Sequence, residues 1–146
     1  MRLSTRTRYA ARALLDLAVH QDQQPVSLRE IVARQGVSRK YLEHLFAAMQ
    51  AAGLVRSVRG RRGGYALARA PEEITVRDIY EVAEGAEEVL PCDEAPGMLR
   101  AEECVMQDVW AAMHAAMVGV LESVSLAELA RRAEDRAQSR GGMYHI

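Results

Sequence analysis

The sequence predicts a mainly α-helical protein with one small two-stranded β-sheet, and three patterns support this fold class. Residues 27–53 hold two helical patterns separated by a sharp turn. Residues 54–69 hold two short strand patterns around a basic, glycine-rich tip. Residues 103–123 form a long helical pattern with an apolar stripe. Together they predict a winged helix–turn–helix with a small two-stranded β wing and a long C-terminal dimerisation helix.

Before these patterns, Ser4 or Thr5 is expected to cap a first helix that runs to about Gln21. Its apolar side follows the helical period and consists of Tyr9, Ala10, Ala13, Leu14, Leu17 and Ala18. The other face is expected to carry Arg6, Arg12 and Asp16. A polar break up to Pro25 then separates this helix from the next.

Capping residues define the two helices of the predicted helix–turn–helix. Ser27 and Glu30 fit a capping box, in which each side chain satisfies a backbone N–H at the helix start. Gly36 is expected to stop this helix in a left-handed conformation, and Ser38 to cap the following one. The predicted buried side chains are Leu28, Ile31 and Val32 in the first helix, and Leu42, Leu45, Phe46 and Met49 in the second.

The second of these helices exposes polar residues near its N-terminal end, which is the arrangement of a recognition helix in DNA. Arginine and lysine donate to guanine, glutamate accepts from cytosine, and the positive end of the helix dipole favours phosphate. The predicted DNA contacts here are Ser38, Arg39, Lys40, Tyr41, Glu43 and His44. An ordinary solvated helix face is the alternative, and the neighbouring hairpin decides against it.

The hairpin is expected to pair strands at residues 54–58 and 65–67 around a tip that holds glycines and three arginines. Glycines permit positive φ and close backbone approach, and the arginines form a cationic finger for phosphates or a narrow minor groove. The predicted DNA contacts here are Arg56, Arg59, Gly60, Arg61 and Arg62. A nucleotide-phosphate cradle fits poorly, because the spacing matches neither glycine-rich nucleotide motif.

Beyond the hairpin, Thr75 is expected to cap a short helix to about Glu84, with Ile79, Val82 and Ala83 on its apolar side. The stripe of the long helix consists of Val105, Val109, Met113, Ala116, Met117, Val120, Leu121 and Val124, with Trp110 beside it. Since the earlier helices supply most of a small core, this stripe is expected to face a helix of a second protomer. Packing back on its own domain is the alternative.

A second capping box, at Ser125 and Glu128, is expected to open a last helix to about Gln138. The predicted organisation therefore has four parts. They are a winged helix–turn–helix DNA-binding domain at 1–84, a cysteine-containing sensor loop at 85–103, the dimerisation and C-terminal helices at 104–138, and a flexible tail at 139–146.

Charge is divided between the two halves of the chain, although the net charge is only −1. Residues 1–70 hold 13 basic and 4 acidic residues, a net of +9, whereas residues 71–146 hold 6 basic and 16 acidic residues, a net of −10. This asymmetry favours a basic half that faces nucleic acid, with a solvated charged surface as the alternative. No apolar run approaches the ~20 residues of a membrane span, so a cytoplasmic protein without a membrane partner is expected.

Three segments, in order, resemble the Rrf-two family of dimeric winged helix–turn–helix transcription regulators. They read MRLSTRTRYAARALLDLA at the start, SRKYLEHLF in the recognition helix and VRGRRGGY in the wing. The best-known branch of this family is the iron–sulfur cluster regulators (IscR-like), and the resemblance covers essentially the whole chain. It implies a homodimer on a roughly palindromic promoter operator. It also implies contacts to the operator from Arg39, Lys40, Glu43 and, in the minor groove, Arg59.

The predicted function is therefore a sequence-specific DNA-binding transcription regulator, with repression as the expected mode. Family wings often read RGPGGGY, so Arg61 and Arg62 make this wing more basic and predict a steeper dependence of affinity on salt. The alternative is a protein-interaction module that uses the winged helix and long helix without reading DNA. An enzyme is not expected, because no nucleophile–base–acid constellation is visible.

Cluster-binding members of the family carry three cysteines in the loop and a further ligand, often a histidine early in the next helix. This chain has Cys92 and Cys104, while Met98 and Gln107 stand where the other two ligands are expected. Neither a thioether nor an amide is a good ligand for such a cluster, which is held by thiolates and sometimes by imidazole.

Three interpretations of the cysteine pair stay open. In the first, Cys92 and Cys104 hold a [2Fe–2S] cluster together with unusual ligands, which come from the other subunit or from Glu94, Glu102, Glu103 or Asp108. In the second, the two thiols form a reversible disulfide, although the flanking acids disfavour the thiolate and slow this chemistry. In the third, the loop is a relic or senses a small molecule or a protein without metal.

Overall fold

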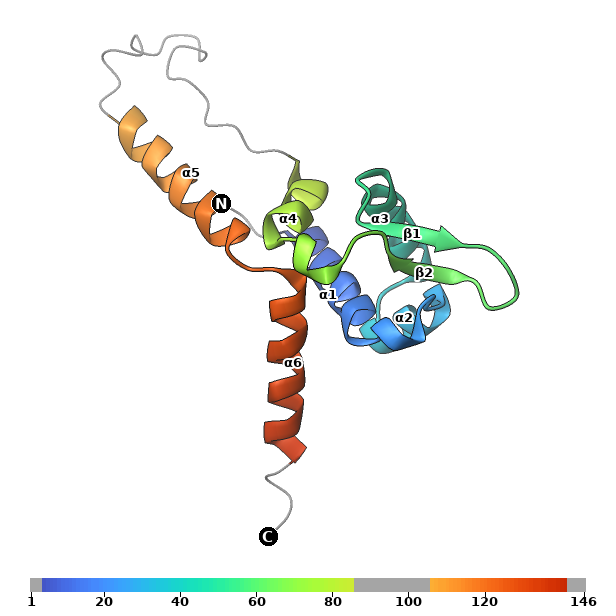
Figure 1. The fold of residues 1–146 in the computed structure, drawn as a ribbon. Coiled ribbons are helices and arrows are strands. Elements are labelled where there is room, and N and C mark those ends of the chain that lie inside the picture. The colour runs from blue at the N-terminus through green and yellow to red at the C-terminus, as the bar shows by residue number, and fades with distance from the viewer. Residues whose placement is uncertain (1–3, 86–105, 142–146) are drawn as a thin grey trace.

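The computed structural model describes residues 4–85 and 106–141 of the chain. In Figure 1, helices α1 to α4 and the hairpin pack together, and residues 4–85 are called the winged body below. Helices α5 and α6 extend from it in two different directions. The mainly helical fold with a two-stranded wing is confirmed. The elements are α1 (Thr5–Val19), η1 (Gln21–Gln23), α2 (Leu28–Gln35), α3 (Arg39–Ala51), β1 (Val55–Val58), β2 (Gly64–Leu67), η2 (Pro71–Glu73), α4 (Val76–Glu84), α5 (Gln107–Glu122) and α6 (Leu126–Gly141).

The first helix begins where the sequence predicts and ends slightly earlier. Ser4 caps α1, because its hydroxyl accepts hydrogen bonds from two N–H groups of the first turn. The helix ends at Val19 rather than near Gln21, and the chain continues into the short 3-10 helix η1. The predicted apolar side is buried at Ala10, Ala13, Leu14, Leu17 and Ala18, while Tyr9 is half-buried.

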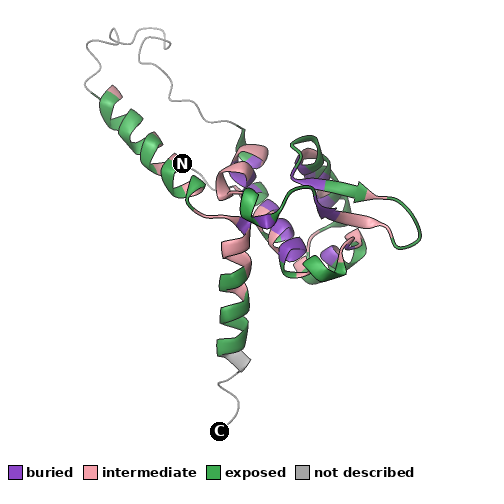
Figure 2. Cartoon of the chain, in the orientation of Figure 1, coloured by how far each residue is buried: buried purple, intermediate pink, exposed green. Residues whose placement is uncertain are grey.

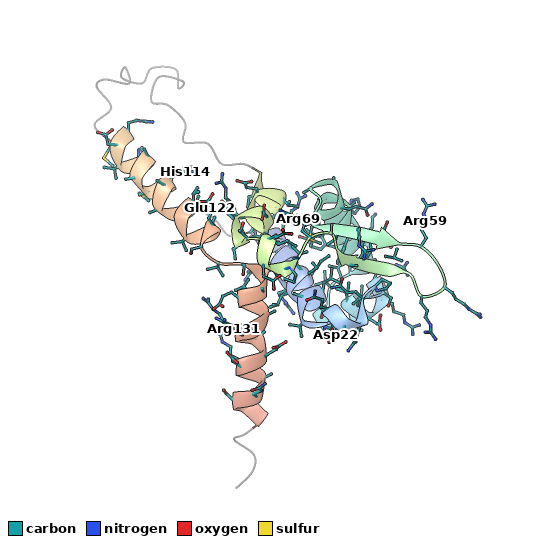
Figure 3. The ribbon with its side chains drawn as sticks, viewed as in Figure 1. Asp22, Arg59, Arg69, His114, Glu122 and Arg131 are labelled. Atoms are coloured by element: carbon teal, nitrogen blue, oxygen red, sulfur yellow. The ribbon has the colours of Figure 1, made fainter. Side chains whose placement is uncertain are left out.

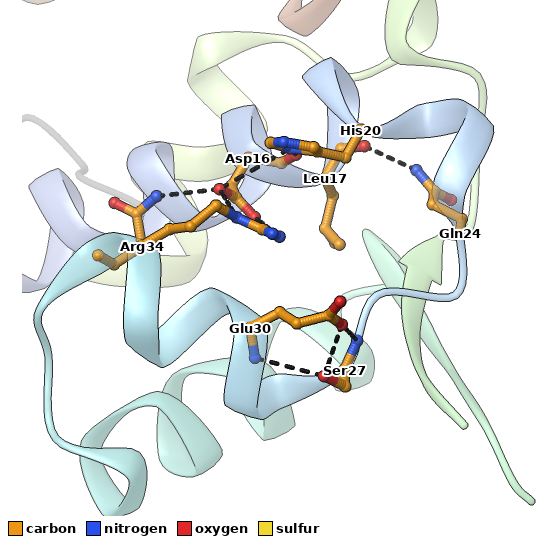
Figure 4. A network of polar contacts seen from close by, with 8 residues as sticks. Asp16, Leu17, His20, Gln24, Ser27, Glu30 and Arg34 are labelled. Atoms are coloured by element: carbon orange, nitrogen blue, oxygen red, sulfur yellow. Dashed lines mark hydrogen bonds and ion pairs between the residues drawn. The ribbon is translucent and has the colours of Figure 1, made fainter. Parts of the chain in front are cut away.

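Asp16 is predicted on the outer face of α1, and this prediction is wrong, because the residue is only 7% exposed. Arg34 of α2 donates to both of its carboxylate oxygens at 2.8 Å, and Gln35 donates to one of them at 3.3 Å. These bonds make burial of the charge possible, since a buried charge needs a charged, hydrogen-bonded partner. The hydrogen bond to Asp16 raises the pKa of Arg34, and this ion pair ties α1 to α2 (Figure 4).

The turn between α2 and α3 forms as the capping residues predict. The N–H of Glu30 donates to Ser27 Oγ at 3.3 Å, and the N–H of Ser27 donates to Glu30 Oε2 at 2.9 Å. The hydrogen bonds from Ser27 lower the pKa of the Glu30 carboxyl. Gly36 ends α2 in the left-handed region at φ 65°. Ser38 then begins α3, because its Oγ accepts from the N–H of Tyr41 at 3.3 Å.

The core lies where α1 and α3 meet the hairpin and α4. The predicted side chains of α3, which are Leu42, Leu45, Phe46 and Met49, are all buried, whereas Ile31 is the fully buried one of the three predicted in α2. The ring of Phe46 packs on Tyr65 of β2, with centroids 4.4 Å apart. Figure 2 shows this buried layer within the winged body and an exposed surface over most of α5.

The wing is a two-stranded antiparallel sheet that is fastened to the segment between α1 and α2. Val55 of β1 lies opposite Leu67 of β2. On the other edge of β2, Val26 and Tyr65 exchange two backbone hydrogen bonds of 2.9 and 2.8 Å. Position 64 must be glycine for this approach, since a Cβ there would lie 2.2 Å from the carbonyl oxygen of Val26.

The fourth helix is capped as predicted, by reciprocal hydrogen bonds between Thr75 and Asp78. Tyr80 is buried beside the predicted Ile79 and Ala83, although the apolar pattern did not include it, and Val82 is half-buried. The end of this helix approaches the start of α1, where Glu84 accepts hydrogen bonds from Ser4 and Thr7.

The start of α6 packs on the winged body rather than standing apart from it. Leu126 is fully buried, its N–H donates to Ile74 O at 2.7 Å, and the N–H of Val76 donates to Val124 O at 2.9 Å. The N–H of Glu128 donates to Ser125 Oγ, as predicted. The helix continues to Gly141, past its predicted end near Gln138.

Several predictions fall on parts of the chain that are not described. The sensor loop beyond Gly85 lies outside the described residues, with Cys92, Met98 and Cys104, and so does the tail from residue 142. Among residues 4–85 and 106–141, no helix is long and apolar enough to cross a membrane.

Candidate nucleic-acid interface

The first turns of α3 present the polar residues that the sequence predicts for base contacts. Ser38, Arg39, Lys40, Glu43 and His44 are exposed. Arg39 Nε donates to Glu43 Oε1 at 2.8 Å across one helical turn. An exposed pair of this kind contributes only about 0.2–1 kcal/mol, so exchanging it for contacts to bases or phosphates costs little.

Tyr41 differs from its neighbours, because it is half-buried and supports α3. Its ring meets the edge of Tyr9 from α1, with centroids 5.7 Å apart and planes at 73°. The guanidinium of Arg12 lies 5.8 Å from the Tyr9 centroid, and its Nε donates to Gln35 Oε1 at 2.9 Å. The sequence interpretation did not single out this chain of contacts. It joins α1, the end of α2 and the start of α3.

The wing carries three of its four arginines at the far end of the hairpin and the fourth, Arg56, near the base of β1. Arg56, Arg59, Arg61 and Arg62 are all exposed, and Figure 3 shows Arg59 directed away from the winged body. Gly60 adopts φ 124°, and a Cβ at Gly63 would lie 2.4 Å from a carbonyl oxygen of β1. The glycines therefore make the tight tip, as predicted, and the arginines surround it.

In the described part of the chain, Lys40 of α3 and the four arginines of the wing are free of ion pairs, whereas several cations of the scaffold are paired. Arg34, Arg69, Arg77, Arg131 and Arg132 each lie within 4.0 Å of a carboxylate. Within residues 4–85 and 106–141, by contrast, Lys40, Arg56, Arg59, Arg61 and Arg62 form no ion pair and donate no side-chain hydrogen bond. Arg6, Arg8, Arg29 and Arg136 are also exposed and unpaired among these residues, but they are spread over α1, α2 and α6. The five free cations of α3 and the wing gather on the elements that the sequence assigns to DNA.

Helix α5 exposes much of its apolar stripe. None of its residues is buried, and Trp110, Met113 and Val120 are 47%, 59% and 67% exposed. Met117, Leu121 and Val124 are half-buried, because this end of the helix lies against the winged body, where Arg77 of α4 pairs with Glu122. The predicted stripe thus divides into an end that rests on its own domain and a longer part in contact with solvent.

The predicted cluster ligands Cys92 and Cys104 are not described, so their geometry stays a prediction. Gln107, the first residue of α5, and the exposed Asp108 are the two described residues near them. No group of three or more His, Cys, Asp or Glu within residues 4–85 and 106–141 is placed to hold a metal ion.

Comparison with known proteins identifies the family. A family model described as "Rrf2: Iron-dependent Transcriptional regulator" matches residues 3–132. The chain is 42% identical to "Protein rrf2" of Nitratidesulfovibrio vulgaris (strain Hildenborough) over 134 residues, which cover 91% of this chain and 89% of that protein.

Two further matches agree with this. The chain is 37% identical to "HTH-type transcriptional regulator IscR" of Photorhabdus laumondii, over 92% of this chain and 82% of that protein. The solved structure "T. potens IscR" superposes with a TM-score of 0.78 at 39% identity, covering 99% of this chain and 97% of that one. The winged helix–turn–helix described above therefore belongs to a DNA-binding transcription regulator of the Rrf2 family.

Proposed function

We propose that the chain acts as a homodimeric repressor and reads a promoter operator with α3 and the wing of each protomer. The observation that carries this proposal is the group of five free cations described above, one on α3 and four on the wing. Free cations release the counterions of DNA when they meet phosphates, whereas paired cations must first lose a partner. The helix–turn–helix would place the N-terminal turns of α3 in the major groove.

Each predicted residue then has a defined role. Arg39 and Lys40 donate to guanine edges or to phosphates, and Glu43 accepts from the amino group of cytosine. Arg59 enters the minor groove beside the wing, while Arg61 and Arg62 contact the phosphates around it. Ser38, Tyr41, His44, Arg56 and Gly60 complete the proposed contact surface.

The second protomer is proposed to pack along the exposed part of α5. Trp110, Met113 and Val120 lie on one side of this helix, three and seven residues apart, which is about one and two helical turns. Large exposed apolar patches mark interaction sites. Because Trp110 is the only tryptophan of the chain, its fluorescence reports this contact. Its emission is expected to shift to longer wavelength as the protein is diluted and the protomers separate.

The sensed signal is proposed to act through the segment that holds Cys92 and Cys104. The ligand atoms available in the chain bear on whether an iron–sulfur cluster binds there. The family is described as iron-dependent. This chain holds two cysteines in all, and Gln107 opens α5 where an imidazole ligand is expected. Two thiolates are half of the four ligands that a [2Fe–2S] cluster usually takes, so a cluster here would need the carboxylates named above or residues of the other subunit as its remaining ligands.

The proposed DNA binding does not depend on iron. The three interpretations of Cys92 and Cys104 are separated by experiment. Anaerobic purification followed by an absorbance spectrum and an iron assay tests the cluster directly. About two irons per protomer with visible absorption bands would support it. A colourless protein after reconstitution would leave the disulfide and the metal-free sensor, which titration of thiols under oxidation then distinguishes.

DNA binding is tested with labelled promoter DNA and the variants Lys40→Ala and Arg59→Ala. Each change removes one contact, so each is expected to weaken binding and to lower the salt slope by about one unit where the contact is to phosphate. Arg136→Ala is the matched control, because Arg136 is an exposed arginine on α6 without an ion pair among the described residues. Equal affinity of all three variants and the wild type would contradict the assigned contacts. Absence of affinity for any DNA at low salt would instead favour the protein-interaction module.

A further inference from the structure

Gln24, in the segment between α1 and α2, connects the wing to the first helix with its side chain alone. Its Nε2 donates to the carbonyl oxygen of Leu17 in α1 at 2.8 Å, and its Oε1 accepts from the N–H of Leu67 in β2 at 3.0 Å. Figure 4 shows the first of these bonds. One half-buried amide therefore satisfies backbone groups of two elements that lie 50 residues apart in the chain.

The bond to Leu67 continues the edge of the sheet. Val26 and Tyr65 form an antiparallel bridge on this edge. Two residues further along β2, the N–H of Leu67 points to the same side as that of Tyr65, and position 24 lies opposite it in the same register. The backbone of Gln24 turns away there, because its own N–H bonds to Gln21 O in the cap of η1. Its side-chain oxygen thus takes the place of the missing strand carbonyl.

A contact at the base of the wing has a large effect on the position of the wing tip. The tip of the hairpin lies about five residues beyond Leu67, or about 16 Å at the rise of a strand. A rotation of about 10° at the base would move the tip by about 3 Å, which is the length of a hydrogen bond. The direction of the wing at its base therefore decides whether Arg59, Arg61 and Arg62 reach DNA.

We propose that Gln24 is a positioning residue for DNA binding, which fixes the direction of the wing relative to the helix–turn–helix. It touches no DNA itself. It acts on the wing arginines through Leu67 and β2, and on the helices through Leu17. This inference rests on the proposed role of the wing arginines in operator binding.

Gln24→Met tests the proposal, since methionine keeps the length of the side chain and removes both hydrogen-bonding atoms. Operator affinity is expected to fall about three- to tenfold, the equivalent of one or two ordinary hydrogen bonds. The salt slope is expected to fall by about one unit, because a misdirected wing neutralises fewer phosphates. Arg59→Ala is expected to cost less in this variant than in the wild type, since the two changes remove a shared contribution.

Gln23→Met is the matched control. Gln23 is an exposed neighbour, and its side chain makes no hydrogen bond within the described part of the chain. It is expected to keep the wild-type affinity, salt slope and response to Arg59→Ala. A variant that only lost stability would lower the fraction of active protein, but it would leave the salt slope and the cost of Arg59→Ala unchanged.

Hydrogen exchange in the free protein gives a second readout that needs no DNA. The amide of Leu67 is expected to exchange faster in Gln24→Met, while the amides of α3 keep their protection. If Gln24→Met does not fold, Gln24→Glu replaces it, because it keeps the acceptor for Leu67 and loses the donor to Leu17. The same directions of change in operator affinity and salt slope are expected, with smaller amplitude, while the amide of Leu67 keeps its protection.

The outcomes separate this inference from the proposed function. If Arg59→Ala leaves binding unchanged in the wild-type background, the proposed function of the wing fails. If Arg59→Ala weakens binding while Gln24→Met matches Gln23→Met in salt slope and in the cost of Arg59→Ala, the positioning role of Gln24 is overturned.

Discussion

The winged body and α5 contain similar apolar side chains but place them in opposite environments. In the winged body, Leu14 and Phe46 are fully buried, whereas on α5 Trp110 and Val120 are largely exposed. A helix in water is marginally stable by itself and needs tertiary packing of its apolar face. The difference teaches that the winged body is stabilised within one chain, while α5 has an apolar surface that the described part of its own chain leaves uncovered.

The largest effect is expected from opening the core of the winged body. Phe46→Ala removes a fully buried ring that packs on Tyr65, so it should destabilise the fold by about 3–5 kcal/mol in chemical denaturation. Val120→Ala on α5 is the comparison, and a largely exposed side chain should cost less than about 0.5 kcal/mol. If the cost of Val120→Ala grows with protein concentration, a second protomer covers this residue. If Phe46→Ala and Val120→Ala lower the free energy of unfolding equally at all protein concentrations, the winged body and α5 do not differ in this way.

The next largest effect is expected on association of the protomers. Trp110→Glu places a charge on the exposed stripe of α5, and loss of an aromatic anchor from an interface costs about 2 kcal/mol or more. The dissociation constant of the dimer in sedimentation velocity should therefore rise at least about 30-fold.

Ala115→Glu is the matched control for Trp110→Glu. Ala115 is exposed on the same helix and lies nearly opposite the stripe at 100° per residue. It should leave the dimer intact. If both variants dissociate equally, or neither does, the stripe is not the dimer contact.

Local features of the winged body were predictable from the sequence because they depend on residues close in the chain. Ser27 and Glu30 are three residues apart, and the αL position of Gly36 follows from its place after the last apolar residue of α2. The exposed arginines of the wing also followed from the tip pattern. Each of these features needed only neighbours within one turn or one hairpin.

Long-range contacts were not predictable in the same way. Asp16 was assigned to the outer face, because its burial depends on Arg34, which is 18 residues away. One signal pointed to it, since Asp16 follows Ala13 by three residues and so borders the buried side of α1. The role of Gln24 depends on Leu67, and no sequence pattern relates the two. Residues that position a binding surface are thus harder to predict than the residues on it.

Substitution of one glycine in the winged body and one in α5 by alanine is expected to change the stability of the protein in opposite directions. Gly64→Ala should destabilise the protein by about 1–3 kcal/mol, because the new Cβ would lie 2.2 Å from Val26 O and must displace backbone. Gly119→Ala in α5 should stabilise it by about 0.5–1 kcal/mol, since a Cβ there meets no atom within 4 Å and alanine favours helix. Thermal unfolding of both variants measures the signs. Destabilisation by Gly119→Ala would mean that a partner approaches α5 closely on this side too.

The smallest effect is expected from the carboxylate that joins α4 to the start of α1. Hydrogen bonds from Ser4 and Thr7 lower the pKa of the Glu84 carboxyl. A lowered folded-state pKa contributes stability that is fully present above the unfolded value near 4.5 and is lost as pH falls through the folded value. Glu84→Gln should therefore flatten the dependence of stability on pH in the acid range, and it should leave α5 unaffected.

Glu72→Gln is the control for this last change, because Glu72 is an exposed carboxylate whose side chain makes no hydrogen bond within residues 4–85 and 106–141. Denaturation curves between pH 6 and the acid limit of folding compare the two variants with the wild type. The effect of Glu84→Gln should be modest, since exposed charges are screened by solvent. A pH profile of Glu84→Gln that matches those of the wild type and Glu72→Gln would show that the Glu84 contact does not hold α4 to α1 in solution. The cysteine segment follows Gly85 in the sequence, so that result would also mean that Glu84 does not hold the residues before this segment to α1.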